Sequence, residues 1–305
     1  MSETFVAVPC SDIVAGLGEG VVWDQTRGEL LWVDLLAGVL YRGRPGPSSV
    51  ELLGRLKLGC PLGAVAPATD GGWVVAAGAG FAHLAEDGAL TWIGQPAAGR
   101  PELRMNDGAC DPAGRFWAGT MAYGETPGAG TLYRLDLACT ITAVVPATTV
   151  SNGIGWSADA KTLWYIDSGE RTVDAFDFDM PTGAVSSRRT VVAVAPGDGA
   201  PDGLTVDAED HIWVAMWDGG EVRRYTPGGE LVARVRVPVS RPTSCCFGGA
   251  DLATLFISTA QPAAERQTGE PEAGRLFRAD TGVRGVAQSP YLGRLVGPAK
   301  DFATT

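Results

Sequence analysis

Histidine and basic residues are scarce in this 305-residue sequence. It contains two histidines, His83 and His211, and its 24 Lys and Arg against 35 Asp and Glu leave a net charge of −11. The positive charges are scattered along the chain, so we expect no nucleic-acid partner. Neither histidine begins one of the repeated phrases of the sequence, which argues against a histidine-based catalytic triad.

Long apolar runs and patterned cysteines are also missing. No run approaches membrane-spanning length, and the first residues lack the basic and apolar regions of a signal peptide. The six cysteines, at positions 10, 60, 110, 139, 245 and 246, show no CxxC or metal-finger spacing. We therefore expect a cytoplasmic protein with no membrane partner, whose thiols are reduced and mostly buried. A disulfide between the adjacent Cys245 and Cys246 would be strained and is not expected.

The pattern that is present is a repeat of short strands. Apolar runs alternate with turns, for which the sequence has 42 Gly and 20 Pro, and this is typical of an all-β fold. One phrase recurs: Gly with small or apolar residues, an Asp-type turn, then a strand rich in Trp or Leu. Its occurrences are 42 to 50 residues apart and begin at Glu19, Leu62, Asp107, Asn152, Asp202 and Ser244.

A period in the forties with about four short strands per unit predicts a β-propeller, and six starts predict six blades. We expect residues 1–305 to form a single six-bladed domain. The N-terminal segment TFVAVP precedes the first repeat. It is expected to pair with the last blade, which closes the ring and removes a free sheet edge.

The first residues of the repeats predict a polar site. Five of the six starts carry a side-chain oxygen where a strand favours Val or Ile, and the innermost strand of each blade lines the central channel. Clustered carboxylates repel each other unless a cation or protons neutralise them. Such oxygens suit Ca²⁺, Mg²⁺ or Mn²⁺, while Zn²⁺ and Fe²⁺ also accept them. The alternative is that Asn, Asp and Gly only make turns; Glu19, a poor turn former, speaks against it.

Several segments resemble those of a known family in its own order. They are GEGVVWD, RMNDGACDPAGRFWAGTM, SNGIGWS, PDGLTVDAE and TSCCFGG, and they lie between Gly18 and Arg278. Together they resemble the SMP-30/gluconolactonase/luciferin-regenerating enzyme family, the regucalcin-like group. The resemblance implies a six-bladed propeller with one divalent cation in its channel. It also implies hydrolysis of sugar lactones.

The resemblance further implies roles for individual residues. Glu19, Asn152 and Asp202 resemble the metal ligands, and Asp202 also matches the residue with the acid/base role. Arg104 and Asn106 resemble the pair that contacts the substrate.

Two details of the match differ. The repeat selects Asp107 where the family places Asn106 toward the substrate, so Asp107 is expected to lie behind the substrate contacts. A second substrate-side Glu of the family aligns with Gly124, one residue from Glu125. Tyr123 and Glu125 are therefore the candidates for that wall of the pocket.

We expect a gluconolactonase-like, metal-dependent lactonase whose partner is a small-molecule lactone. Loops 56–63, 122–130 and 260–274 are the candidates for determining specificity. Three alternatives stay open: an organophosphatase or esterase on the same scaffold, a hydrolase of a non-sugar lactone, and a non-catalytic calcium-binding propeller. The sequence leaves open the natural lactone, the metal and the oligomeric state.

Overall fold

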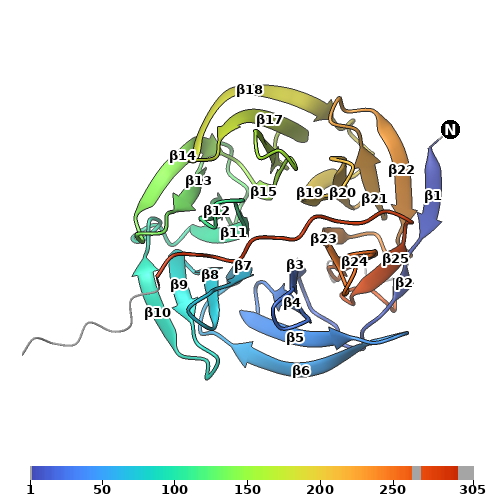
Figure 1. The fold of residues 1–305 in the computed structure, drawn as a ribbon, viewed down its shortest axis with the longest axis horizontal. Helices are drawn as coiled ribbons and strands as arrows, with labels where there is room; N and C mark the ends of the chain where they lie inside the picture. The colour runs from blue at the N-terminus through green and yellow to red at the C-terminus, as the bar shows by residue number, and fades with distance from the viewer. Residues whose placement is uncertain (1, 263–268, 295–305) are drawn as a thin grey trace, which may run out of the picture.

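The fold is a ring of six sheets around a central channel (Figure 1). The structure, a computed structural model, describes residues 2–262 and 269–294, and its regular elements in these ranges are all strands. The predicted all-β, six-bladed propeller is thereby confirmed. Within the described ranges no helix is long and apolar enough to cross a membrane.

Each blade is a sheet of antiparallel strands, with one parallel outer strand added in the fifth. We name the blades in chain order and give their strands from the channel outward. The first blade consists of β3 (Gly18–Asp24), β4 (Glu29–Asp34), β5 (Val39–Pro45) and β6 (Val50–Lys57). The second consists of β7 (Leu62–Pro67), β8 (Trp73–Ala77), β9 (Gly80–Leu84) and β10 (Leu90–Gly94). The third consists of β11 (Leu103–Cys110), β12 (Phe116–Ala122), β13 (Gly130–Leu135) and β14 (Ile141–Thr148).

The other three blades follow the same order. The fourth consists of β15 (Ser151–Trp156), β16 (Thr162–Asp167), β17 (Thr172–Asp179) and β18 (Ala184–Ala193). The fifth consists of β19 (Ala200–Val206), β20 (Ile212–Trp217), β21 (Glu221–Tyr225), β22 (Leu231–Arg236) and β1 (Glu3–Val6). The sixth consists of β23 (Pro242–Gly248), β24 (Thr254–Thr259), β25 (Phe277–Asp280) and β2 (Val8–Pro9).

The N-terminal segment is shared between two blades. β2 pairs antiparallel with β25 and supplies the outermost strand of the sixth blade. β1 pairs parallel with β22 and adds an outer strand to the fifth blade, which the sequence analysis did not anticipate. Both contacts bring the beginning of the chain against its last blades and cover sheet edges that would otherwise be free.

The recurring Asp and Trp of the sequence phrase meet within a blade. In the third blade, Asp111 Oδ1 accepts hydrogen bonds from backbone N–H groups of the turn, and its Oδ2 accepts one from the indole of Trp117. Asp207 and Trp213 repeat this arrangement in the fifth blade. The aspartate therefore closes the turn between the two innermost strands and also satisfies a buried indole N–H.

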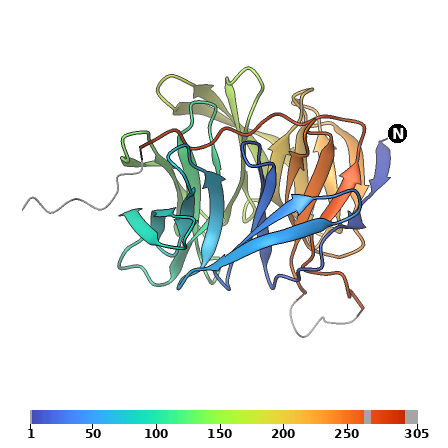
Figure 2. The ribbon, with the colours of Figure 1, turned by 60° about the horizontal axis from the view of Figure 1, so that its bottom comes forward.

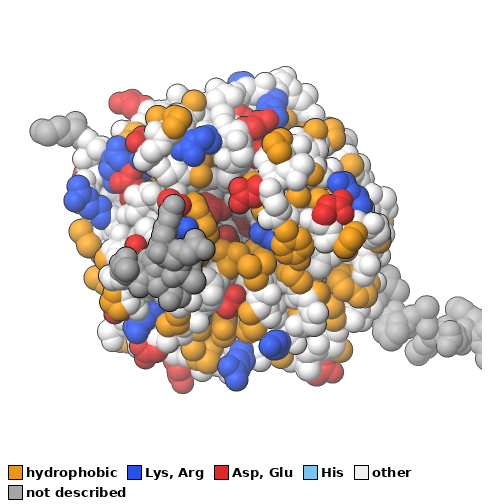
Figure 3. All heavy atoms as spheres, turned by 180° about the vertical axis from the view of Figure 1, so that it is seen from behind, with side chains coloured by type: hydrophobic (Ala, Val, Ile, Leu, Met, Phe, Trp, Pro, Cys, Tyr) orange, Lys and Arg blue, Asp and Glu red, His pale blue; other side chains and the backbone are white. Residues whose placement is uncertain are grey.

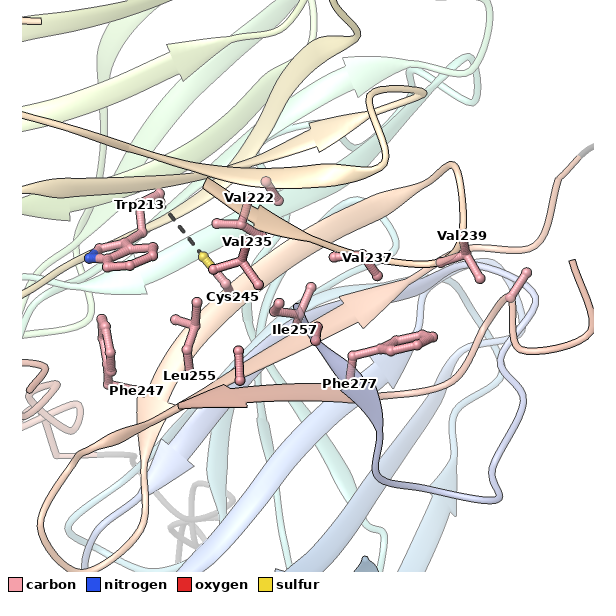
Figure 4. Close-up of a cluster of buried hydrophobic side chains, with 14 residues drawn as sticks. Trp213, Val222, Val235, Val237, Val239, Cys245, Phe247, Leu255, Ile257 and Phe277 are labelled. Atoms are coloured by element: carbon pink, nitrogen blue, oxygen red, sulfur yellow. Dashed lines mark hydrogen bonds between the residues drawn. The ribbon is translucent and has the colours of Figure 1, made fainter. Parts of the chain in front are cut away.

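The core consists of apolar clusters between neighbouring blades. Figure 4 shows one of them, where Trp213 and Val235 of the fifth blade face Phe247, Leu255 and Phe277 of the sixth. The rings of Trp213 and Phe247 meet edge to face with centroids 5.7 Å apart, a favourable geometry for aromatic pairs. Because such clusters occupy the gaps between the blades, side-chain packing holds the sheets around the channel.

A C-terminal segment crosses one mouth of the channel (Figures 1 and 2). Gly285 forms a bridge with Asp207 after the innermost strand of the fifth blade, and Tyr291 forms one with Ala68 after that of the second. We call residues 283–291 the strap. Its contacts lie beyond the C-terminal ends of β19 and β7, so the strap covers the mouth toward which the innermost strands run.

Candidate functional site

The innermost strands share an irregularity that places polar side chains at the channel. Each of them shifts register once against the second strand of its blade. In β15 the shift follows Ser151 and sets Asn152 and Gly153 in a bulge; in β19 it follows Pro201 and does the same for Asp202 and Gly203. A β-bulge redirects side chains and is common beside functional sites.

The glycines of the pairs Asn152-Gly153 and Asp202-Gly203 are explained by close packing around the channel. A Cβ at Gly153 would lie 2.6 Å from the backbone oxygen of Asp202 on the next innermost strand. A Cβ at Gly203 would likewise lie 2.6 Å from the hydroxyl of Ser244. Each pair therefore combines a polar side chain with the absence of a side chain where the neighbouring strand approaches.

The bulges also show which of Asn106 and Asp107 corresponds to Asn152 and Asp202. In β11 the register shift follows Met105, so that Asn106 is the residue structurally equivalent to Asn152 and Asp202. The sequence repeat had aligned Asp107 with them, one residue too late. It also aligned Glu19, which precedes the bulge of β3 by one residue. The dipeptide Asp107-Gly108 matches Asp202-Gly203 in sequence, but Gly108 is already paired with Ala118 beyond the bulge, whereas Gly203 lies within it.

Asn106 and Asn152 are the two asparagines of the whole sequence, and they are hydrogen-bonded to each other. Asn106 Nδ2 donates to Asn152 Oδ1 over 2.7 Å and to the backbone oxygen of Ser151 over 2.8 Å. Both side chains are buried. The third and fourth blades are thus joined at the channel by an amide pair.

Arg104 connects the predicted substrate side with the predicted cation side. Its Nη1 donates to Asn106 Oδ1 and to the backbone oxygen of Met105. The guanidinium is buried, and burial lowers its pKa while the charges of Glu19 and Asp202 raise it. Its Nε has no hydrogen-bond partner among the described residues. Arg104 is therefore a buried cation whose Nε–H is left for another group.

Two buried carboxylates, Glu19 and Asp202, act on this guanidinium, and the half-buried Asp107 acts on both of them. Burial raises the pKa of Glu19, and the nearby charge of Asp107 raises it further. Burial raises the pKa of Asp202 well above its ordinary value, with added repulsion from Glu19 and Asp107. Three negative charges against one positive charge form an unbalanced set in a place that water barely reaches, and either protons or a cation must neutralise it.

The donor set fits a divalent cation. Asp202 Oδ1 is buried and has no hydrogen-bond partner among the described residues, although buried polar atoms are normally satisfied. Across the same ranges no three side chains of the His, Cys, Asp and Glu types are grouped to hold a metal. A cation bound by Glu19 and Asp202 would therefore need the amide oxygen of Asn152 as well. Carboxylate and amide oxygens are hard ligands of the kind Ca²⁺ and Mg²⁺ prefer.

Tyr123 and Glu125 lie at the rim, after β12. The guanidinium of Arg104 lies over the ring of Tyr123, 5.9 Å from its centroid, and Tyr123 is 52% exposed. Glu125 is exposed, has a left-handed backbone with φ 52°, and acts electrostatically on Arg104. On the same face, Asp and Glu side chains lie in a hollow at the centre of the ring (Figure 3).

Asp107 faces a second space, on the other side of the bulges. A cavity of about 180 Å³ is lined by the later residues of the innermost strands, among them Asp107, Trp156 and Cys245, and by residues 286–289 of the strap. Burial raises the pKa of Asp107 to about 6, although the N–H of Gly108 donates to its Oδ1. Asp107 thus lies between the carboxylate pair and the strap-covered end of the channel.

The two histidines lie away from the site. His83 and His211 contact backbone oxygens of Gly71 and Glu209, and neither touches the predicted site residues. All six cysteines are free. Of the three specificity loops, residues 263–268 of loop 260–274 lie outside the described residues.

The family of the chain follows from comparison with known proteins. The sequence model of one protein family, described as the SMP-30/Gluconolactonase/LRE-like region, matches residues 17–261. The chain belongs to this family.

Relatives within the SMP-30/Gluconolactonase/LRE-like family match nearly the whole chain. Regucalcin of Xenopus laevis is 36% identical over 287 residues, covering 91% of this chain and 95% of its own. The crystal structure of a calcium-binding protein, regucalcin, from Agrobacterium tumefaciens superimposes with a TM-score of 0.88 at 26% identity, covering 95% and 99% of the two chains. A luciferin-regenerating enzyme gives a TM-score of 0.85 at 28% identity, covering 92% and 96%.

Two elements around the site escaped the sequence analysis. Ser168, which follows β16, accepts a hydrogen bond from Asn152 Nδ2 over 2.7 Å. Its position outside the innermost strands gave no repeat signal. The strap is the second element, and no repeated phrase marks it either. Only a three-dimensional arrangement brings both to the channel.

Proposed function

We propose that this chain is a divalent-cation-dependent lactonase that opens sugar lactones of the aldonolactone class. The observation that carries the proposal is the buried pair Glu19 and Asp202 beside Arg104, with Asp107 adding a third negative charge and Asp202 Oδ1 left without a hydrogen-bond partner among the described residues. Membership of a family named in part after gluconolactonase supports the lactone as substrate. The calcium-binding relative from Agrobacterium tumefaciens supports the cation.

Glu19, Asn152 and Asp202 would hold the cation through two carboxylates and an amide oxygen. When bound, a divalent cation supplies Lewis-acid polarisation of an ester carbonyl and balances the buried negative charge. The three residues come from β3, β15 and β19 in three different blades. Rigid strands fix such a set better than a single loop does.

Asp202 is proposed as the general base and acid. Its Oδ1 lacks any hydrogen-bond partner in the described part of the chain, so one carboxylate oxygen would face the cation and the other would accept a proton from an attacking water. It would then return that proton to the ring oxygen that leaves the carbonyl carbon. The products are balanced: the C–O bond of the ester breaks, and one water is divided between acid and alcohol.

Arg104 and Asn106 would orient the sugar. The unpartnered Nε of Arg104 is a donor for a hydroxyl or carbonyl oxygen. Tyr123 and Glu125 stand at the rim beside it and would contact the more exposed end of the sugar. Orientation of the lactone by several fixed donors lowers the entropic part of the barrier.

The test is a comparison of substrate classes in one assay. Purified protein with added Ca²⁺, Mn²⁺, Mg²⁺ or Zn²⁺ is offered aldonolactones, a non-sugar lactone, an aryl ester and a phosphotriester. The proposal predicts turnover of aldonolactones well above their spontaneous hydrolysis and above the other classes. Preferential hydrolysis of the aryl ester or phosphotriester would replace it with the related esterase activity. Tight cation binding without turnover of any ester would leave a calcium-binding propeller.

A further inference from the structure

A chain of hydrogen bonds crosses three blades at the channel. It runs from Arg104 to Asn106 Oδ1, and from Asn106 Nδ2 to Asn152 Oδ1 over 2.7 Å. It continues from Asn152 Nδ2 to Ser168 Oγ over 2.7 Å, and from the Ser168 hydroxyl to the backbone oxygen of Pro201 over 2.5 Å. Pro201 directly precedes Asp202. The chain therefore ends beside the residue proposed as base.

The direction of this chain is fixed by its two ends. A guanidinium can only donate and a backbone carbonyl can only accept. Since Arg104 donates at one end, Asn106 must turn its oxygen to Arg104 and its nitrogen to Asn152. At the other end the backbone oxygen of Pro201 accepts the hydroxyl proton of Ser168. Ser168 Oγ can therefore only accept from Asn152. Each amide thus has one consistent orientation, which settles the usual ambiguity between its oxygen and nitrogen.

We propose that Ser168 is a positioning residue that keeps the oxygen of Asn152, rather than its nitrogen, available for a cation. Without the hydroxyl, Asn152 Nδ2 loses its acceptor, and the hydrogen bond from Asn106 alone holds the amide, so its oxygen is less firmly fixed for a cation. That a cation binds at Asn152 rests on the proposed function. The hydrogen bond from Asn152 to Ser168 is independent of that function.

The asparagine content makes the orientation directly measurable. Because Asn106 and Asn152 are the two asparagines of the chain, protein labelled with ¹⁵N-asparagine shows two side-chain NH₂ groups in an NMR spectrum. The Asn106→Ala variant assigns them. Metal-free wild type is compared with Ser168→Ala, Ser168→Thr and the control Ser157→Ala. Ser157 carries a hydroxyl that is also hydrogen-bonded, to backbone N–H groups of Lys161 and Thr162.

We expect Ser168→Ala to move the Asn152 side-chain signals toward those of a free amide. Calcium affinity, measured by calorimetry, should fall about tenfold, in the range typical for residues that orient a metal ligand. Ser168→Thr retains a hydroxyl and should restore both properties, while Ser157→Ala should change neither. The Asn106 signals and the backbone signals of both asparagines show that each variant is folded.

The outcomes separate this inference from the proposed function. Unchanged Asn152 signals in folded Ser168→Ala overturn the positioning role, whatever the lactone assay gives. Unchanged calcium affinity in a variant with displaced Asn152 signals also overturns it. Displaced signals in a protein whose wild type binds no cation overturn the proposed function and limit Ser168 to orienting the amide.

Discussion

The side-chain amide of Asn106 donates a hydrogen bond to Asn152 Oδ1 over 2.7 Å, across the boundary between the third and fourth blades. Asn106 also accepts from Arg104 on its other side. The residue proposed to meet the substrate and the residue proposed to meet the cation are therefore in direct contact. A substitution at Asn106 or at Asn152 should therefore affect both substrate binding and cation binding.

Asn106→Ala tests this coupling. The variant removes the acceptor of Arg104 and the donor to Asn152, and we expect kcat/KM for the best lactone to fall about 10- to 100-fold, as for other positioning changes. Calcium affinity should fall several-fold in the same protein. Steady-state kinetics and calorimetry measure the two effects, with Ser157→Ala as the control. A catalytic loss at unchanged calcium affinity would mean that the two halves of the site act independently.

Tyr123 should influence substrate binding more than the chemical step. The guanidinium of Arg104 lies over its ring, a contact worth about 0.5–1 kcal/mol at an exposed site. We expect Tyr123→Ala to raise KM about three- to fivefold, with a smaller effect on kcat. Tyr123→Phe keeps the ring and should stay close to wild type. If the phenylalanine variant loses as much as the alanine variant, the hydroxyl rather than the ring is responsible.

The buried carboxylates predict an unusual pH dependence of the metal-free protein. The folded state raises the pKa of Asp107 from 3.8 to about 6 and raises those of Glu19 and Asp202 as well. The folded chain therefore holds more protons than the unfolded chain, and its stability is full below about pH 4 and falls as the pH rises. Melting temperatures in a chelator should decrease from pH 4.5 to 7.5.

Two comparisons check the origin of this decrease. Asp107→Asn cannot ionise, so it should flatten the part of the curve below about pH 6. Saturating Ca²⁺ should raise the melting temperature most at the high-pH end, where the carboxylates lack protons. A metal-free protein that becomes more stable over this range would show that the carboxylates are already compensated by other groups.

The strap should contribute to the stability of the ring. The side chain of Tyr291 is fully buried, and its hydroxyl donates to the backbone oxygen of Asp136 over 2.7 Å. Removing only the hydroxyl in Tyr291→Phe should cost about 1 kcal/mol. Tyr291→Ala also leaves a cavity and should cost about 3–5 kcal/mol. Urea unfolding measures both; equal stabilities of the two variants and wild type would show that the strap is not part of the cooperative unit.

Much of the architecture could be predicted because the same sequence pattern recurs in the blades of a propeller. The Asp turn and the Trp strand recur in successive blades, and the hydrogen bond between Asp207 and Trp213 shows why they occur together. The polar first residues of the repeats also stood out, because Glu19, Asn152 and Asp202 replace the Val or Ile that a strand prefers. The structure places Glu19 and Asp202 close enough to interact electrostatically.

The rest depends on features that no repeat records. The bulge of β11 makes Asn106, rather than the Asp107 that the repeat had selected, the equivalent of Asn152 and Asp202, and a bulge has no fixed sequence signature. Ser168 reaches Asn152 from a turn 16 residues away. The strap and the pairing of β1 with β22 are contacts between segments far apart in the chain, which local patterns cannot specify.

The most direct test of the account is lactone hydrolysis by metal-free protein titrated with a single cation, in wild type and in Asp202→Asn. The account predicts that turnover of an aldonolactone rises with added Ca²⁺ or Mn²⁺ and levels off at one equivalent per chain. In Asp202→Asn, kcat should fall at least 100-fold, the usual scale for loss of a general base. Turnover that survives chelation would contradict the cation site. Turnover that persists in the variant at the wild-type rate would contradict the role of Asp202.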